Sequence, residues 1–156
     1  MTVLEESDAR RAAFQILRRV EQEGAYSSLL LQNLGEHRAL APRDLALATE
    51  LVYGVLRRRL HLDHLLAKFS SRPIADIDPD LARILRLALY QILYLDRIPA
   101  HAAVNTAVDM ARARMKGKGE SAASFVNGLL RAVTRGRTAE GKPQTQTGDP
   151  ITALAI

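Results

Sequence analysis

The stretch LARILRLALYQILYL, residues 81–95, decides the fold. Apolar residues occupy nearly every face of this segment, and only Arg83, Arg86 and Gln91 interrupt them. A surface helix carries its apolar residues on one side, so a helix that is apolar all round must be covered by other helices. The Asp-Pro pair at 78–79 supplies an N-cap and a first-turn residue. The sequence therefore predicts a central, buried helix.

Six other segments repeat apolar residues at the helical period of 3.6 residues. They cover residues 8–23, 27–35, 42–56, 60–69, 99–115 and 121–136, and the fourth either continues or restarts the third. Residues 70–78 contain Pro73, end just before Pro79 and show no period, which indicates a loop. No segment alternates polar and apolar residues as a strand does. We therefore expect an all-α bundle of about seven helices around the central one.

Gly54 lies inside the apolar stripe of the third helix. Glycine in a helix interior is less favourable than alanine by up to about 1 kcal/mol, so it needs a compensating role. We interpret it as a position that lets another backbone approach closely.

The length and the end of the sequence indicate how the chain is divided. A chain of 156 residues suits one domain with its own core. Residues 137–149, RTAEGKPQTQTGD, have the polar, turn-rich composition of a linker, and apolar residues return at Ile151, Leu154 and Ile156. We expect a domain over 1–136, followed over 137–156 by a linker and the start of a C-terminal region missing from this chain.

Several functional classes are disfavoured by what the sequence lacks. There is no cysteine, which excludes disulfides, thiolate zinc sites and a cysteine nucleophile. The acidic, polar start MTVLEESDARR does not resemble a secretory signal, and no apolar run is long enough to span a membrane. We expect a cytoplasmic protein with no membrane partner.

No catalytic constellation is visible either. His61, Asp63 and His64 form a cluster in which the two histidines, at i and i+3, could share a helix face as metal ligands. No further ligand lies nearby in sequence, and ordinary packing is the favoured interpretation. The serines lie at caps and turns, and the Gly-Lys-Gly at 117–119 lacks the strand and glycine spacing of a phosphate-binding loop. We expect no catalytic residue, metal or cofactor, and no enzyme activity of this chain alone.

The charge is unevenly distributed. The net charge is +5, whereas residues 112–137 alone carry +6, and Arg57, Arg58 and Arg59 form a second basic cluster. Such runs are often only a solvated helix face. The alternative is a basic surface, formed by the first helix, the 116–118 loop and the last helix, that binds polyanions by neutralising phosphates.

Particular residues of this surface are candidates for contact with RNA. Lys116, Lys118 and Arg131 would neutralise phosphates, and Phe125 or Tyr26 would stack on an unpaired base, although a core position is the favoured interpretation for either ring.

Three motifs resemble the NusB family: LRLALYQ at 85–91, IPAHAAVNTAVDMA at 98–111 and SFVNGLLR at 124–131. With ELVYGVLRRRLHLD at 50–63 and the first helix, the resemblance spans about residues 8–135. It implies an all-α fold with two helical subdomains, and RNA binding.

Two kinds of protein carry such a domain. Freestanding members act in transcription antitermination with the ribosomal protein NusE, and RsmB-type (Sun family) small-subunit rRNA cytosine-5 methyltransferases carry the domain at their N-terminus. The stretches at 23–32 and 52–66 look more like the methyltransferase kind. Leu81 stands where antitermination members carry an acidic residue that meets NusE, which makes NusE the less favoured partner. A third alternative is a helical interaction module whose basic face is incidental.

The resemblance also implies site residues. The arginine-rich N-terminus of the family contacts RNA; Arg10 falls on a matching position, and Arg11 and Arg18 continue the basic character. Asn105 and Asn127 belong to the shared motifs, and we expect them to point inward and tie helix ends together.

Overall fold

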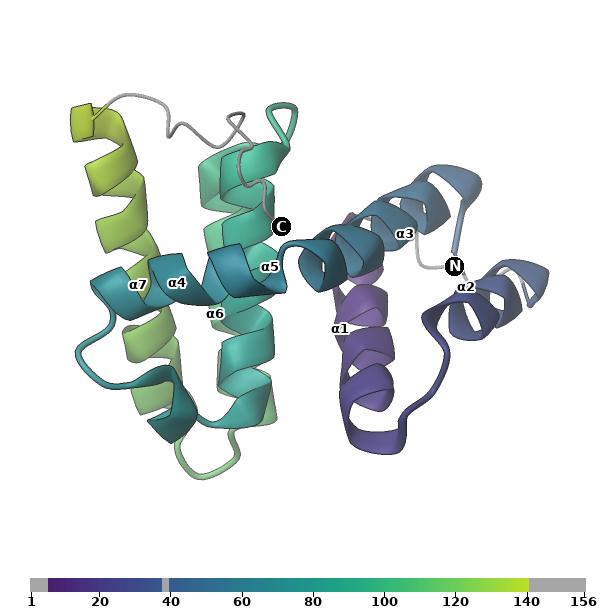
Figure 1. Cartoon of the computed structure of the whole chain (residues 1–156), viewed down its shortest axis with the longest axis horizontal. Helices are drawn as coiled ribbons and strands as arrows, with labels where there is room; N and C mark the ends of the chain where they lie inside the picture. The colour runs from purple at the N-terminus through teal and green to yellow at the C-terminus, as the bar shows by residue number, and fades with distance from the viewer. Residues whose placement is uncertain (1–5, 38–39, 141–156) are drawn as a thin grey trace.

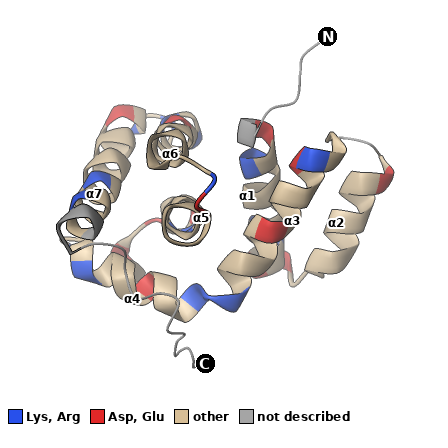
Figure 2. Ribbon diagram, turned by 90° about the horizontal axis from the view of Figure 1, so that it is seen from above, with Lys and Arg blue, Asp and Glu red and all other residues tan. Residues whose placement is uncertain are grey.

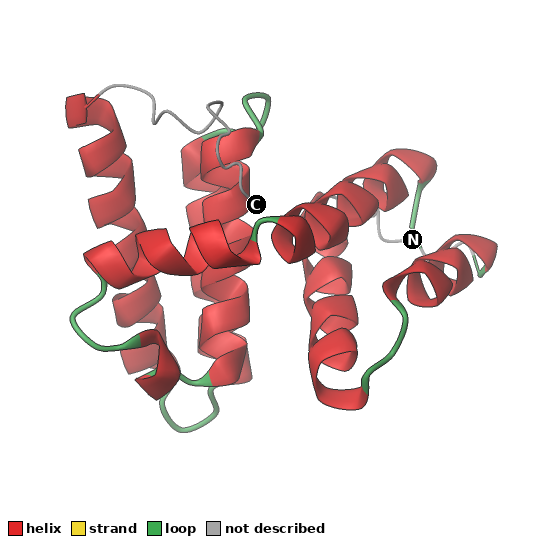
Figure 3. Ribbon diagram, viewed as in Figure 1, coloured by secondary structure: helices red, strands yellow, loops and turns green. Residues whose placement is uncertain are grey.

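The computed structural model describes residues 6–37 and 40–140, with the side chains of 8–37 and 40–136. Within these residues lie seven α-helices, one 3-10 turn and no strand (Figures 1 and 3). The elements are α1 (Glu6–Glu23), α2 (Ser27–Glu36), α3 (Pro42–Arg57), α4 (Arg59–Phe69), η1 (Ile74–Asp76), α5 (Pro79–Tyr94), α6 (Ala100–Arg114) and α7 (Gly119–Glu140). The prediction of an all-α bundle is confirmed.

Helix α5 is the centre of the molecule. Every residue from 81 to 93 is buried, and α5 contacts α1 and α3 on one side and α4, α6 and α7 on the other. Figure 1 shows α1–α3 as one group and α4–α7 as a second, so the expected pair of helical subdomains is present. The prediction of a buried central helix is also confirmed.

Helix ends follow local sequence signals, with two corrections. The Asp78 carboxylate accepts a hydrogen bond from the Asp80 backbone N–H at 2.8 Å, as an N-cap does. Helix α7 begins at Gly119, before Ser121, and runs to Glu140, past the predicted end at 136. The Ser121 hydroxyl donates to the Lys118 carbonyl inside the first turn instead of capping the helix. The linker was predicted to begin at residue 137, but residues 137–140 belong to α7, and the rest of the predicted linker lies outside the described residues.

The two arginines inside α5 are buried and paired with carboxylates: Glu21 and Asp63 come from other helices, and Asp80 lies on α5 itself. Arg83 donates to Glu21 of α1 and, at 2.7 Å, to Asp80. Arg86 donates to Asp63 of α4 at 2.6 Å. A buried guanidinium is tolerated only when paired and hydrogen-bonded. This network therefore holds α1 and α4 against the central helix.

Gly54 has a packing role, but its neighbour differs from the prediction. A Cβ at this position would lie 2.1 Å from Cζ of Tyr90 on α5. The close approach is therefore by an aromatic ring and not by another backbone. Tyr90 in turn stacks on Tyr94, with ring centroids 5.2 Å apart.

Candidate nucleic-acid interface

The connection between α6 and α7 presents two lysines. Lys116 and Lys118 are both exposed, and Gly117 between them takes φ +81°, a left-handed conformation that allows the tight turn. Among the side chains of residues 8–37 and 40–136, no carboxylate forms an ion pair with either ammonium group. The nearby Glu120 carboxylate instead accepts from Arg112 Nε at 2.9 Å. Both lysines are therefore available to an anion from solvent.

Two arginines lie next to this connection and share one carboxylate. Arg114 Nε donates to Asp80 Oδ2 at 2.7 Å, and Arg18 Nε lies 4.0 Å from Asp80 Oδ1. Each of the two side chains is about one third exposed. Burial alone would raise the pKa of Asp80, but hydrogen bonds from Arg114 and Arg83 outweigh it and hold that pKa below its usual value. Asp80 therefore remains charged, and the positive charge around it exceeds its own.

We call Arg18, Arg114, Lys116 and Lys118 the basic edge. Three of these residues were predicted site residues: Arg18 from α1, and Lys116 and Lys118 from the α6–α7 connection. Arg114 was not among them. The sequence places Arg18 far from the lysines. Arg18 and Arg114 share a contact with Asp80, and the Arg114 guanidinium also lies 5.4 Å from the Phe14 ring centroid, so α1 and the end of α6 are held together.

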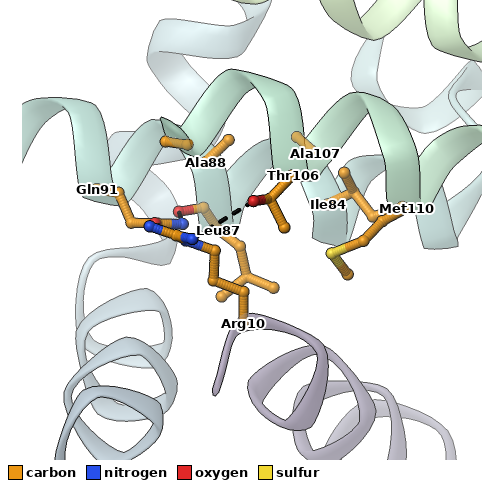
Figure 4. Close-up of a pocket in the computed structure, with 9 residues that line it drawn as sticks. Arg10, Ile84, Leu87, Ala88, Gln91, Thr106, Ala107 and Met110 are labelled. Carbon is orange, nitrogen blue, oxygen red and sulfur yellow. Dashed lines mark hydrogen bonds between the residues drawn. The ribbon is translucent and has the colours of Figure 1, made fainter. Parts of the chain in front are cut away.

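Arg10 lies elsewhere, in the interior between α1, α5 and α6. Its side chain is 4% exposed, and its Nε donates to Gln91 Oε1 at 2.5 Å, while Nη1 donates to Thr106 Oγ1 at 3.4 Å (Figure 4). The cavity beside it measures about 10 Å³, which is room for no more than about one water. The expectation that Arg10 belongs to an exposed basic surface is therefore corrected.

The remaining predicted residues are dispersed. Arg11 is exposed on α1, Arg131 is exposed on α7, and Phe125 is half-buried, with the Arg72 guanidinium 4.3 Å from its ring centroid. Tyr26, the other predicted stacking ring, is exposed at the start of α2. Figure 2 shows lysine and arginine segments spread over several helices. The predicted single surface is thus divided into separate groups.

In the second basic cluster, Arg57–Arg59, the last two arginines make contacts within the protein. Arg59 donates to Glu21 at 2.8 Å, and the Arg58 guanidinium lies 4.3 Å from the Tyr94 ring centroid. Arg57 is exposed, whereas Arg58 and Arg59 are half-buried. Figure 2 shows this run at the connection between α3 and α4.

Sequence reasoning missed a groove between the first half of α6 and the second half of α7. Asn105 is exposed and lines it, and Asn127 accepts from Arg131 within α7 at 3.3 Å. The expectation that Asn105 points inward is therefore wrong. A signal was present in the sequence, because His101 and Asn105 share a helix face at i and i+4.

In the histidine and carboxylate cluster on α4, Asp63 is engaged in ion pairs, whereas His61 and His64 are exposed. Asp63 accepts from Arg86 and lies 3.6 Å from Arg59. Burial, with smaller effects of His64 and Arg58, lowers the pKa of His61. In the described part of the chain no three histidine or acidic side chains converge as metal ligands. Nor is any helix there long and apolar enough to cross a bilayer.

This fold and sequence define a class of protein. The family model described as "NusB family" matches residues 7–135. The chain belongs to the NusB family.

Particular relatives fall into two groups. "Probable ribosomal RNA small subunit methyltransferase B" of Synechocystis is 44% identical over 81% of this chain, which spans only 28% of that protein. "Transcription antitermination protein NusB" of Xanthomonas euvesicatoria is 30% identical over 91% of this chain and 86% of that protein. Among solved structures, T. maritima NusB matches with a TM-score of 0.73 at 19% identity, covering 93% of this chain and 98% of that one, which shows the fold alone.

The first group is much longer than this chain. The chain spans 28–32% of the methyltransferase-named relatives, so more than two thirds of each has no counterpart in these 156 residues.

Proposed function

We propose that this chain is a noncatalytic RNA-binding domain and forms the N-terminal part of a small-subunit ribosomal RNA cytosine-5 methyltransferase. The observation that carries the proposal is the 44% identity to the Synechocystis methyltransferase-named relative, against 30% to the antitermination protein. In this proposal residues 1–136 form the RNA-binding domain, and 137–156 lead toward the catalytic region. The location proposed with it is cytoplasmic.

The basic edge supplies the physical support. Lys116 and Lys118 are exposed and have no carboxylate partner among the described side chains. Arg114 precedes them at the end of α6 and shares Asp80 with Arg18. Such cations gain affinity for RNA by neutralising phosphates and releasing counterions, so binding should weaken as salt rises.

The experiment is a salt titration of RNA binding. The 156-residue chain and its Lys116→Ala/Lys118→Ala variant are titrated with oligoribonucleotides that tile small-subunit ribosomal RNA, at several salt concentrations. Each lost phosphate contact should lower the slope of log K against log salt by about 1. We expect the variant to bind more weakly and to have a slope smaller by about 1 to 2.

A charge-matched control separates a local effect from a general one. Arg43→Ala/Lys68→Ala removes the same charge from exposed positions on α3 and α4. If the control and the lysine variant lose affinity equally, the basic edge is not the RNA surface. If the wild-type chain binds none of the RNAs, the proposal of RNA binding fails.

The second candidate is a freestanding antitermination factor that acts with NusE. It is favoured by one observation: the Xanthomonas antitermination protein is 30% identical over 91% of this chain. A pull-down with purified NusE distinguishes the two. Stable, RNA-enhanced capture would support the antitermination role, and no capture at micromolar concentration would leave the methyltransferase role as the better one.

A further inference from the structure

The groove between α6 and α7 has the shape and lining of a small binding site. It has a volume of about 290 Å³, similar to the lower limit of ligand pockets. Ala100 and Val104 form its apolar part, and His101, Asn105, Arg131 and Arg135 supply polar groups. None of the four residues of the basic edge lines this groove, and of the predicted RNA contacts only Arg131 does.

The charge in the groove is positive. Arg131 and Arg135 are both exposed and lie one helical turn apart on α7. Arg131 Nε donates to the neutral Asn127 amide at 3.3 Å, which orients the guanidinium without neutralising it. Among the described residues that line the groove none is acidic, and in the described chain Arg135 has no carboxylate partner. An anion therefore meets two unneutralised guanidinium groups.

The lining combines three features that an unpaired nucleotide needs. Guanidinium groups bind phosphate with paired N–H donors. Imidazole rings and apolar side chains pack against the face of a base that is splayed out of the strand. The Asn105 amide carries both donors and an acceptor for a base edge. An acidic peptide would satisfy the arginines but would leave the apolar part and the imidazole without a matching group.

We propose that this groove is a subsite for one unpaired nucleotide of single-stranded RNA, with the phosphate on Arg131 and Arg135 and the base against His101 and Val104. The inference rests on the proposed RNA-binding function. The groove and the basic edge lie at opposite ends of the α6–α7 hairpin (Figure 1). A 15-residue helix such as α6 is about 20 Å long. The two sites therefore contact different nucleotides.

The test compares an oligoribonucleotide with its abasic counterpart. The probes are pentauridylate and a five-unit ribose-phosphate chain without bases, measured by fluorescence anisotropy at low salt. Because the groove contacts a base, the wild-type chain should bind pentauridylate about tenfold more tightly than the abasic chain. Arg131→Gln/Arg135→Gln should weaken pentauridylate binding about tenfold or more, and Asn105→Glu, which adds a negative charge inside the groove, should do the same.

Both kinds of groove variant alter exposed positions, and thermal melts verify that they fold. Arg43→Gln/Lys68→Gln is the charge-matched control and should bind like wild type. Lys116→Ala/Lys118→Ala should weaken both probes and keep the difference between them, because the basic edge contacts phosphates only.

Each failure has its own signature. If the groove variants bind pentauridylate like the control while the lysine variant is weakened, the groove inference is overturned and the proposed function stands. If wild type binds both probes equally, the groove holds no base and the inference is also overturned. Binding of pentaglutamate to the groove as tight as that of pentauridylate would assign the site to acidic peptides instead. If wild type binds neither these probes nor any ribosomal RNA fragment, the proposed function itself fails.

Discussion

The side chains of Arg10 and Gln91 meet inside the protein, although 81 positions separate them in the sequence, and Arg10 Nε donates to Gln91 Oε1 at 2.5 Å. Gln91 Nε2 in turn donates to the Leu87 carbonyl at 2.9 Å. The pair joins the first helix to the central one. A residue that the family resemblance marks as an RNA contact is thus a structural residue in this chain.

Replacing Arg10 should therefore lower stability more than it affects RNA binding. Arg10→Met leaves the buried Gln91 oxygen without its donor, which should lower the free energy of unfolding by about 2 kcal/mol. Arg10→Met/Gln91→Met should recover at least half of that loss, because removing both polar partners removes the unmet hydrogen bond. Urea unfolding measures both. Arg11→Met, exposed and adjacent, serves as the control and should change stability by less than about 0.5 kcal/mol. An RNA salt slope that falls in folded Arg10→Met would contradict the structural role.

The contact between Gly54 and the Tyr90 ring gives a second prediction. Gly54→Ala improves helix propensity by about 1 kcal/mol, but its Cβ would overlap a ring that is 5% exposed and stacked on Tyr94. Overpacking of this kind costs about 1–3 kcal/mol, so we expect a net loss of stability. Gly128→Ala is the matched control: it is also helical, and nothing lies within 4 Å of the added Cβ. It should be neutral or stabilising in the same thermal melt, and equal effects of the two substitutions would refute the packing argument.

Local signals were sufficient to predict most of the fold. The apolar run at 81–95 predicts burial on all sides, and Asp78 predicts the helix start, because both depend on residues a few positions apart. Arg10 shows where such reasoning is incomplete. It shares a face with Ala13 and Leu17 at i+3 and i+7, so its periodicity already indicates an inward position. Its charge and the family resemblance instead favoured an exposed position in contact with RNA. Burial is tolerable because Arg10 pairs with Gln91, and the sequence of the first helix alone cannot reveal this partner on another helix.

The candidate site was less predictable for the same reason. The exposure of Lys116 and Lys118 is predictable because side chains in a glycine-rich turn point into solvent. The contribution of Arg114 depends on its contact with Asp80, and the groove depends on which turns of α6 and α7 pack together. Neither can be derived from one segment alone.

Asp80 gives a prediction for the dependence of stability on pH. Its pKa is lowered in the folded protein, so its stabilising contribution is complete above its pKa in the unfolded chain, about 4, and is lost as pH falls through the folded value. Asp80→Asn should lower the free energy of unfolding by about 2 kcal/mol at pH 7, because Arg83 and Arg114 lose a shared carboxylate. The difference from wild type should shrink toward pH 3. Denaturant titrations at both pH values measure this difference.

Asp109→Asn, in an exposed pair with Arg112, is the control and should lower the free energy of unfolding by less than about 0.5 kcal/mol. An effect of Asp80→Asn that does not vary with pH would contradict the proposed link between the Asp80 charge and stability.

Phe125 permits a direct choice between packing and base stacking. Its ring is half-buried against the core and lies under the Arg72 guanidinium at 4.3 Å. Stacking of a base on an aromatic ring contributes about 1–3 kcal/mol, so loss of a true stacking ring would weaken RNA binding about fivefold or more. Because Arg72 already occupies the ring face, we expect Phe125→Leu to change RNA affinity by less than twofold while lowering stability by about 1 kcal/mol. Arg72→Ala adds a second measurement. It uncovers the Phe125 ring but also removes a surface cation, so the affinity for RNA should not rise. A fivefold loss in folded Phe125→Leu would return this ring to the RNA interface.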